Sequence, residues 1–270
     1  MTTLEAILLA ITEGVTEFLP ISSTAHMIFL SSIFGISQDE FVKMFQVSIQ
    51  FGAILAVVFL YWRKFFDFKS IQFYFKLCLA VIPALVLGKL FDDKIEAVLE
   101  KPIPIAITLV IGGVILLFID RLFKNTHIEQ EENIGLLSAL KIGFWQCLAM
   151  MPGTSRAAAS IIGGMQQGLN RKTAAEFSFF LAVPTMLAVT TYSLFLKDWK
   201  YHGVEQSGIK MIFSSSNNTM LFFLGNILAF IVAIISIKFF MGIISKYGFK
   251  IWGWYRIIIG LVLVAYFSIK

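Results

Sequence analysis

The chain has 270 residues, of which 58% are hydrophobic and only 14% are charged, and its apolar runs are close to the ~20 residues that cross a bilayer. This composition excludes an ordinary soluble domain and predicts a polytopic, all-α membrane protein. The net charge of +5 comes from basic residues in short loops between the apolar runs, which indicates membrane topology and argues against a nucleic-acid partner.

The first apolar segment is interrupted by polar residues. The run from Leu4 to Pro20 is too short and too polar to be a membrane span, and it ends at a proline that breaks the helix. We therefore predict a re-entrant helix-loop-helix hairpin. The segment has no basic start, so we do not expect it to be a cleavable signal peptide.

Glu13 and Glu17 lie four residues apart, which places both carboxylates on one helical face. Like charges this close in an apolar setting call for a shared proton, a cationic partner or a divalent metal. Acidic oxygen ligands suit Mg²⁺ or Ca²⁺. The simpler alternative is that both glutamates extend from an interfacial helix into water.

Three hydroxyl residues, Ser22, Ser23 and Thr24, follow Pro20 at the expected start of the next short helix. A helix N-terminus with hydroxyls attracts phosphate, although an ordinary N-cap has the same pattern. His26 lies three residues beyond Ser23, where an imidazole could act as base, acid or nucleophile beside a phosphoryl group.

Six membrane spans are predicted after this hairpin, three on each side of a second polar cluster. They are Met44 to Tyr61, Gln72 to Leu90, Ile103 to Ile119, Ala174 to Leu196, Met220 to Phe240 and Ile251 to Ile269.

The second polar cluster, PGTSRAAAS, ends another run that is too short to span, Leu136 to Pro152. We predict a second re-entrant hairpin here. Gly153 would let the backbone approach a ligand closely, and Arg156 offers a planar charged fork that matches phosphate oxygens. The alternative for this arginine is a structural ion pair with Glu13 or Glu17. Further hydroxyls come from Thr154, Ser155 and Ser160.

The two clusters fall on each other at an offset of 132 residues, which pairs Pro20 with Pro152 and Ser23 with Ser155. This register predicts two repeats, residues 1–122 and 134–270, within a single membrane domain over residues 1–270.

The basic loops indicate that the second repeat is inverted. Arg63, Lys64 and Lys69 mark the loop after the first span as cytoplasmic, and the later loops agree with one alternating assignment that places both termini outside. One hairpin would then enter from each side of the membrane, and their loops would meet near the midplane around an internal site.

The segments EGVTEFLPISSTAH and PGTSRAAAS resemble the two signature motifs of the bacterial undecaprenyl pyrophosphate phosphatase family of the BacA type, which is associated with bacitracin resistance. The resemblance extends over essentially the whole chain. The chain departs from the family pattern at Ala25, Ala157, Ala158 and Ser160, and the departure at Ala157 puts in doubt any catalytic role for that position.

The resemblance implies removal of the terminal phosphate from undecaprenyl pyrophosphate at the outer face of the bacterial cytoplasmic membrane. The product is the monophosphate carrier of cell-wall synthesis. Implied partners are a polyprenyl pyrophosphate lipid, the membrane and a divalent cation, and the sequence is compatible with a homodimer. The implied site is catalytic Glu17, Ser23, His26 and Arg156, substrate-binding Ser22, Thr24, Gly153, Thr154, Ser155 and Ser160, and metal-binding Glu13 and Glu17.

Several alternatives stay open at this point. The nucleophile could be Ser23, with His26 or Glu17 as base, or His26 itself, or a metal-bound water. Another lipid phosphatase superfamily, with PSGH-like and SR motifs, lacks support because the next histidine after Arg156 is the distant His202. A transporter or lipid flippase would also use inverted repeats with hairpins that meet at the midplane.

Overall fold

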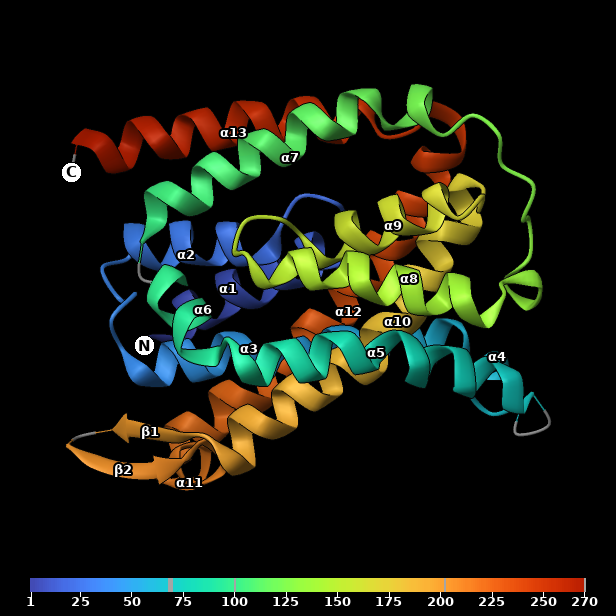
Figure 1. Cartoon of the computed structure of the whole chain (residues 1–270). Coiled ribbons are helices and arrows are strands. Elements are labelled where there is room, and N and C mark those ends of the chain that lie inside the picture. Colours follow the sequence, from blue (N-terminus) through green and yellow to red (C-terminus); the bar gives the residue numbers. More distant parts are fainter. Residues whose placement is uncertain (68–69, 100, 202, 270) are drawn as a thin grey trace.

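The computed structural model of the chain describes residues 1–67, 70–99, 101–201 and 203–269. The predictions that involve Lys69 and His202 lie outside these residues. Figure 1 shows two long helices side by side along one edge, α7 (Pro102–Leu122) and α13 (Lys250–Ile269). Shorter helices lie in the middle, and the remaining long helices lie on the other side.

The six predicted spans are confirmed as six helices that are long and apolar enough to cross a membrane. Besides α7 and α13 they are α3 (Glu40–Leu60), α5 (Ile71–Leu90), α10 (Arg171–Thr191), which continues through η3 (Tyr192–Leu196), and α12 (Ser216–Tyr247). The protein is therefore a multi-pass membrane protein.

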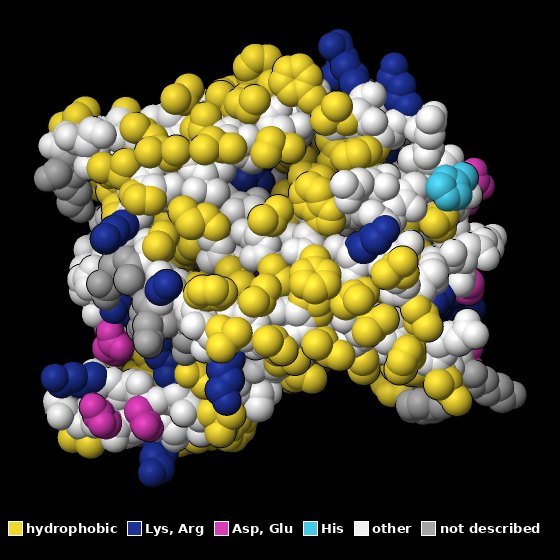
Figure 2. All heavy atoms as spheres, in the orientation of Figure 1, with side chains coloured by type: hydrophobic (Ala, Val, Ile, Leu, Met, Phe, Trp, Pro, Cys, Tyr) yellow, Lys and Arg dark blue, Asp and Glu magenta, His cyan; other side chains and the backbone are white. Residues whose placement is uncertain are grey.

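Helix α12 is longer than the predicted span, because the residues that cap its two ends lie outside the apolar run. The Ser215 side chain accepts a hydrogen bond from the Asn218 backbone at the start, and Gly248, with φ of 68°, ends the helix. Large apolar side chains remain exposed along the spans. Figure 2 shows them as a broad apolar surface across the visible face, with most Lys and Arg side chains toward its margins, as expected where lipid replaces water.

Each polar cluster forms a pair of short helices. The first pair is α1 (Thr3–Thr16) and α2 (Ser23–Ile33), and the second is α8 (Leu136–Gln146), extended by η2 (Cys147–Met150), and α9 (Arg156–Gln166). Helix α1 packs on α3 and α12, whereas α8 packs between α5 and α9. An 11-residue helix such as α2 or α9 is about 16 Å long, roughly half of the hydrocarbon thickness.

The two loops share one backbone conformation at the serine that precedes the second helix, which is Ser22 in one loop and Ser155 in the other. Their φ angles, 69° and 73°, are the only positive values among the described residues other than glycine. Each hydroxyl caps the following helix, accepting from the backbone N–H of Ala25 and Ala158 respectively. The offset of 132 paired Ser23 with Ser155, and this pairing is wrong by one position, because backbone geometry makes Ser22 the counterpart of Ser155.

The loop after α1 is anchored in the main apolar core. Phe18 is fully buried, and its ring meets the Phe179 ring of α10 edge to face with centroids 5.5 Å apart. Leu19 and Ile21 are buried in the same cluster. The loop that carries the polar residues around Pro20 is therefore packed against the apolar core.

We predicted an all-α protein, and the chain is mostly helical but contains one short β-hairpin. Strands β1 (Asp198–Tyr201) and β2 (Val204–Ser207) pair antiparallel, and Gly203, with φ of 80°, lies in the turn between them. Trp199 is buried, and its indole N–H donates to the Ser193 carbonyl at 2.9 Å. The remaining short elements are α4 (Trp62–Phe65), α6 (Asp92–Leu99), η1 (Glu131–Asn133) and α11 (Gly208–Phe213).

Candidate active site

Glu17 lies at the centre of the candidate site, in the turn that follows α1. Its Oε2 accepts a hydrogen bond from the Ser23 hydroxyl at 2.5 Å. Its Oε1 accepts from Nε and Nη2 of Arg156, both at 3.3 Å. All three side chains are largely buried. The fold thus brings the first residue of α2, the first residue of α9 and a carboxylate of the first hairpin to one point.

The Ser23–Glu17 contact has the arrangement of a nucleophile with its base. A serine hydroxyl is weakly nucleophilic until a neighbouring group takes its proton, and a carboxylate within hydrogen-bond distance can do so. The contact forms because the turn through Pro20 folds α2 back against the end of α1. Glu17 therefore reaches a serine only six positions further along the chain.

The Arg156 guanidinium is also bound by a residue of α10. Its Nη1 donates to the Ser178 carbonyl at 2.9 Å. The Ser178 hydroxyl is 2.7 Å from the Ser160 hydroxyl, which also donates to the Arg156 carbonyl at 2.8 Å. Ser160 thus supports α9, and its predicted contact with substrate stays a prediction. The sequence did not point to Ser178, because it lies in the apolar run of α10.

Glu13 lies one turn before Glu17 and is 1% exposed. Its Oε1 is buried and has no hydrogen-bond partner among the described residues. A buried carboxylate oxygen of this kind requires a proton or a cation. In the described part of the chain, no three His, Cys, Asp or Glu side chains cluster as a complete metal site. Mg²⁺ commonly takes only one or two carboxylates and adds waters and substrate phosphates, so the pair fits such an ion.

His26 faces Tyr255 of α13. Its Nδ1 is 2.8 Å from the Ser22 carbonyl, and its Nε2 is 2.8 Å from the Tyr255 hydroxyl. The two rings are stacked at 9° with centroids 5.7 Å apart. A carbonyl can only accept, so the proton of the neutral imidazole is assigned to Nδ1, and the Tyr255 hydroxyl donates to Nε2. Within the described residues, no hydrogen bond joins His26 to Ser23.

The other predicted residues lie in the two loops or in the first turn of α2. Thr24 and Thr154 are half-buried; Thr24 lies two residues after the capping Ser22, and Thr154 directly precedes the capping Ser155. Gly153 has φ of 93°, and a Cβ there would stand 2.4 Å from the Ile105 carbonyl of α7. Close packing on α7 therefore requires a glycine at this position. The approach of a ligand to the Gly153 backbone stays a prediction.

Two site residues that the sequence analysis missed, Tyr255 and Arg256, are adjacent in α13. Arg256 is fully buried and donates to backbone carbonyls in both loops. Its sequence signal was a single arginine inside the last apolar run, a place where an ionisable residue usually has a function. Tyr255 gives no comparable signal.

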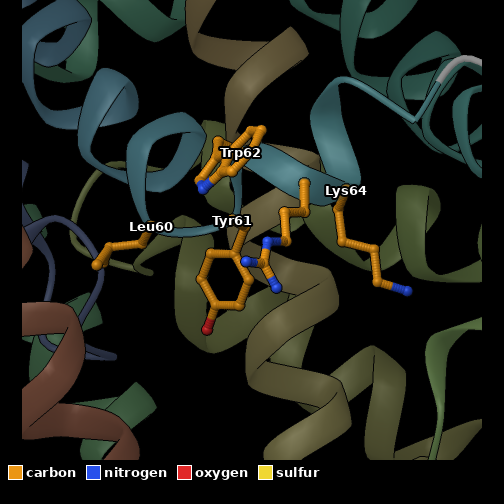
Figure 3. Close-up of a pocket in the computed structure, with 5 residues that line it drawn as sticks. Leu60, Tyr61, Trp62 and Lys64 are labelled. Atoms are coloured by element: carbon orange, nitrogen blue, oxygen red, sulfur yellow. The ribbon is translucent and has the colours of Figure 1, made fainter.

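A surface cavity of about 370 Å³ lies elsewhere, at the junction of α3 and α4. In Figure 3 the side chains of Tyr61, Trp62 and Lys64 point in different directions and do not converge on one spot. Lys64 already donates to Glu131 at 2.5 Å and also to Glu132. The hydrogen bond from Lys64 lowers the pKa of Glu132 below its ordinary value. This cavity includes none of the residues around Glu17.

Comparison with known proteins agrees with this arrangement. The family model described as bacitracin resistance protein BacA matches residues 6–262, which include both loops and Arg256. The chain belongs to the BacA family. Among its relatives in this family are proteins named undecaprenyl-diphosphatase from two species of Flavobacterium. The protein from Flavobacterium johnsoniae is 51% identical over 98% of this chain and 96% of its own length, and that from Flavobacterium psychrophilum is 52% identical over 98% and 95%.

A more distant BacA-family relative, from Porphyromonas gingivalis, has the same name. It is 45% identical over 98% of this chain and 96% of its own length. The similarity therefore covers whole chains and is not limited to the two motifs.

Proposed function

We propose that this BacA-family protein is an undecaprenyl-diphosphatase, which hydrolyses undecaprenyl pyrophosphate to undecaprenyl phosphate and inorganic phosphate. The observation that carries the proposal is the contact of Glu17 with both Ser23 and Arg156 where the two hairpins meet. The names of its close relatives support the same activity. The reaction recycles the lipid carrier of cell-wall synthesis and confers resistance to bacitracin.

In the proposed mechanism Ser23 is the nucleophile. Its Oγ attacks the terminal phosphorus while the hydroxyl proton passes to Glu17, and the bond from that phosphorus to the bridging oxygen breaks. Undecaprenyl phosphate leaves, and water then hydrolyses the phosphoserine to release inorganic phosphate. Positioning and charge neutralisation dominate phosphoryl transfer, and Arg156 supplies both. His26 is a weaker candidate for the attack, because its Nε2 already accepts from Tyr255.

Glu13 and Glu17 are the proposed ligands of a divalent cation, Mg²⁺ or Ca²⁺. The partnerless Oε1 of buried Glu13 supports this assignment. Such an ion, when bound, neutralises negative charge on the pyrophosphate. The hydroxyls and backbone amides of both loops, from Ser22 to Thr24 and from Gly153 to Ser155, would surround the phosphate oxygens.

Purified protein in detergent is expected to release phosphate from undecaprenyl pyrophosphate, and EDTA is expected to stop the release. Mg²⁺ or Ca²⁺ added in excess should restore it, because two adjacent carboxylates then regain their cation. Undecaprenyl monophosphate is the matched control substrate and should release no phosphate. Absence of phosphate release with either cation present would contradict the proposed activity.

The proposed orientation places the site at the outer face of the bacterial cytoplasmic membrane. The two hairpins would be re-entrant and the two halves inverted, which is supported by the shared conformation at Ser22 and Ser155 and by the basic loop at Arg63 and Lys64. The same assay on sealed right-side-out vesicles tests this orientation. Substrate restricted to the outer leaflet should be hydrolysed without permeabilisation.

A lipid flippase is the alternative function, since inverted hairpins also occur in transporters. The contact between Ser23 and Glu17 favours the phosphatase, because transport requires no nucleophile beside a base. Counterflow of lipid without phosphate release would favour the flippase. The homodimer stays a prediction.

Tyr255→Phe is expected to lower kcat about tenfold with little change in KM, because His26, which the family resemblance makes a catalytic residue, loses one hydrogen bond that orients it while the stacked ring remains. Steady-state kinetics measure the effect. ¹⁵N-histidine spectra should show the Nε2 resonance of His26 shifted, and the chain has only three histidines to assign. Tyr247→Phe, at the exposed end of α12, is the control. Unchanged kcat and an unshifted resonance would contradict the role of Tyr255.

A further inference from the structure

Arg256 is a fully buried cation whose hydrogen-bond partners are all backbone carbonyls. Its Nε donates to Leu109 of α7 at 3.1 Å. Its Nη1 donates to Pro20 at 3.0 Å and to Thr154 at 2.9 Å, and its Nη2 donates to Gly153 at 2.9 Å. One guanidinium on α13 therefore joins α7, the loop of the first hairpin and the loop of the second.

Burying the charge of Arg256 in this way costs free energy of folding. Among the described residues no carboxylate forms an ion pair with Arg256, and removing an unpaired charge from water carries a large free-energy penalty. Charge-assisted hydrogen bonds to four carbonyls offset part of that penalty. Lysine could not replace it fully, because its three donors radiate from one atom, whereas the planar guanidinium has five.

Three of the four bonded carbonyls lie in the two loops, two or three residues before the reacting groups. Pro20 is three residues before Ser23, and Thr154 is two residues before Arg156. A peptide unit is planar, so fixing the Thr154 carbonyl toward Arg256 turns the Ser155 N–H to the opposite side of the loop. The guanidinium therefore sets both the separation of the two loops and the direction of their peptide groups.

Gly112 of α7 gives independent evidence that the surroundings are shaped around this guanidinium. A Cβ at Gly112 would stand 2.1 Å from Nη2 of Arg256 and 2.7 Å from Cζ. The side chain could not simply swing aside, because all of its hydrogen bonds would have to break. A glycine at this position therefore leaves the space that the guanidinium occupies.

We propose that Arg256 is a positioning residue of the phosphatase reaction. It touches no substrate, and it acts by holding the two loops so that Ser23, Glu17 and Arg156 stay in register. The inference rests on the proposed function and adds to it a third segment of the chain, far from both motifs in sequence.

Gly112→Ala tests the proposal without removing any functional group. It should displace the guanidinium and lower kcat/KM for undecaprenyl pyrophosphate by about 10- to 100-fold, since a displacement of about 1 Å can cost that much. Gly242→Ala is the matched control, because a Cβ there has nothing within 4 Å. It should stay within about twofold of the wild type, as expected for a surface change that disturbs no contact.

Arg256→Met and Arg256→Lys complete the series. Methionine should abolish turnover, and lysine should restore part of kcat with KM close to that of the wild type. Activity is expressed per monodisperse protein after size exclusion, with the Tm of each variant. A purely structural role would lower yield and Tm but leave the folded fraction fully active. If the methionine variant does not fold, Gly112→Ala still decides the question.

Full activity of folded Gly112→Ala would by itself overturn the role of Arg256. The proposed function would still stand if the wild type released phosphate and variants of Glu17 and Arg156 did not. A wild type that releases no phosphate would instead overturn the function itself. The two failures are therefore distinguishable.

Discussion

Arg156→Ala is expected to reduce phosphate release from undecaprenyl pyrophosphate by at least about 10³-fold, since removing one preorganised charge-stabilising donor commonly costs 10²- to 10³-fold. The alanine variant loses more than one donor, because the guanidinium presents a fork. It also leaves the buried carboxylates Glu13 and Glu17 without their nearby cation, which adds to the loss.

Arg156→Lys separates charge from geometry. Lysine keeps the positive charge but cannot reproduce the paired contacts with Glu17 and the bond to the Ser178 carbonyl, so we expect intermediate activity. Arg121→Lys, at the exposed end of α7, is the control and should behave as the wild type. Initial rates of phosphate release over a range of substrate concentrations provide the measurement. Near-normal rates in the alanine variant would rule out the assigned site.

Glu17→Gln is expected to lower kcat by about 10³-fold, within the 10²- to 10⁴-fold that a positioned base contributes. Glutamine has nearly the same shape, but it cannot take the proton of Ser23 and no longer offers a negative charge to Arg156 or to a cation. The same variant should therefore need a higher Mg²⁺ concentration for half-maximal activity.

Glu129→Gln is the control for this variant, because Glu129 is exposed and lies outside the two hairpins. Ser23→Ala should be as inactive as Glu17→Gln, and combining the two should cost little more than either one, because the residues act as a unit. A Glu17→Gln protein that retains more than a tenth of the wild-type kcat would show that another group accepts the proton.

The spans and the polar clusters could be predicted from sequence because each has a strong physical signature. Long apolar runs must cross the bilayer, and acidic or hydroxyl residues inside such runs must be explained by a site. The pairing of Ser23 with Ser155 was wrong by one position, because matching letters cannot detect the positive φ shared by Ser22 and Ser155. The strands β1 and β2 were missed because four residues are too few for a clear alternating pattern.

The contact between Glu17 and Arg156 was expected either as an ion pair or as two sides of a phosphate site, and the structure contains the pair. The residues that support the site by contacting its side chains or its loops were not predicted. Ser178, Tyr255 and Arg256 lie within apolar spans, and Arg256 binds carbonyls, which every residue possesses and which therefore leave no trace in a sequence. Contacts of this kind appear only once the helices are packed.

The position of Arg256 in α13 also bears on biosynthesis. Its partners at Pro20 and Gly153 precede it by 236 and 103 residues, so the ribosome makes both loops well before α13. Until that helix enters the bilayer, the earlier segments lack the guanidinium that joins their two loops. A nascent chain therefore has the proposed nucleophile and the arginine fork before it has the guanidinium that is proposed to keep them in register.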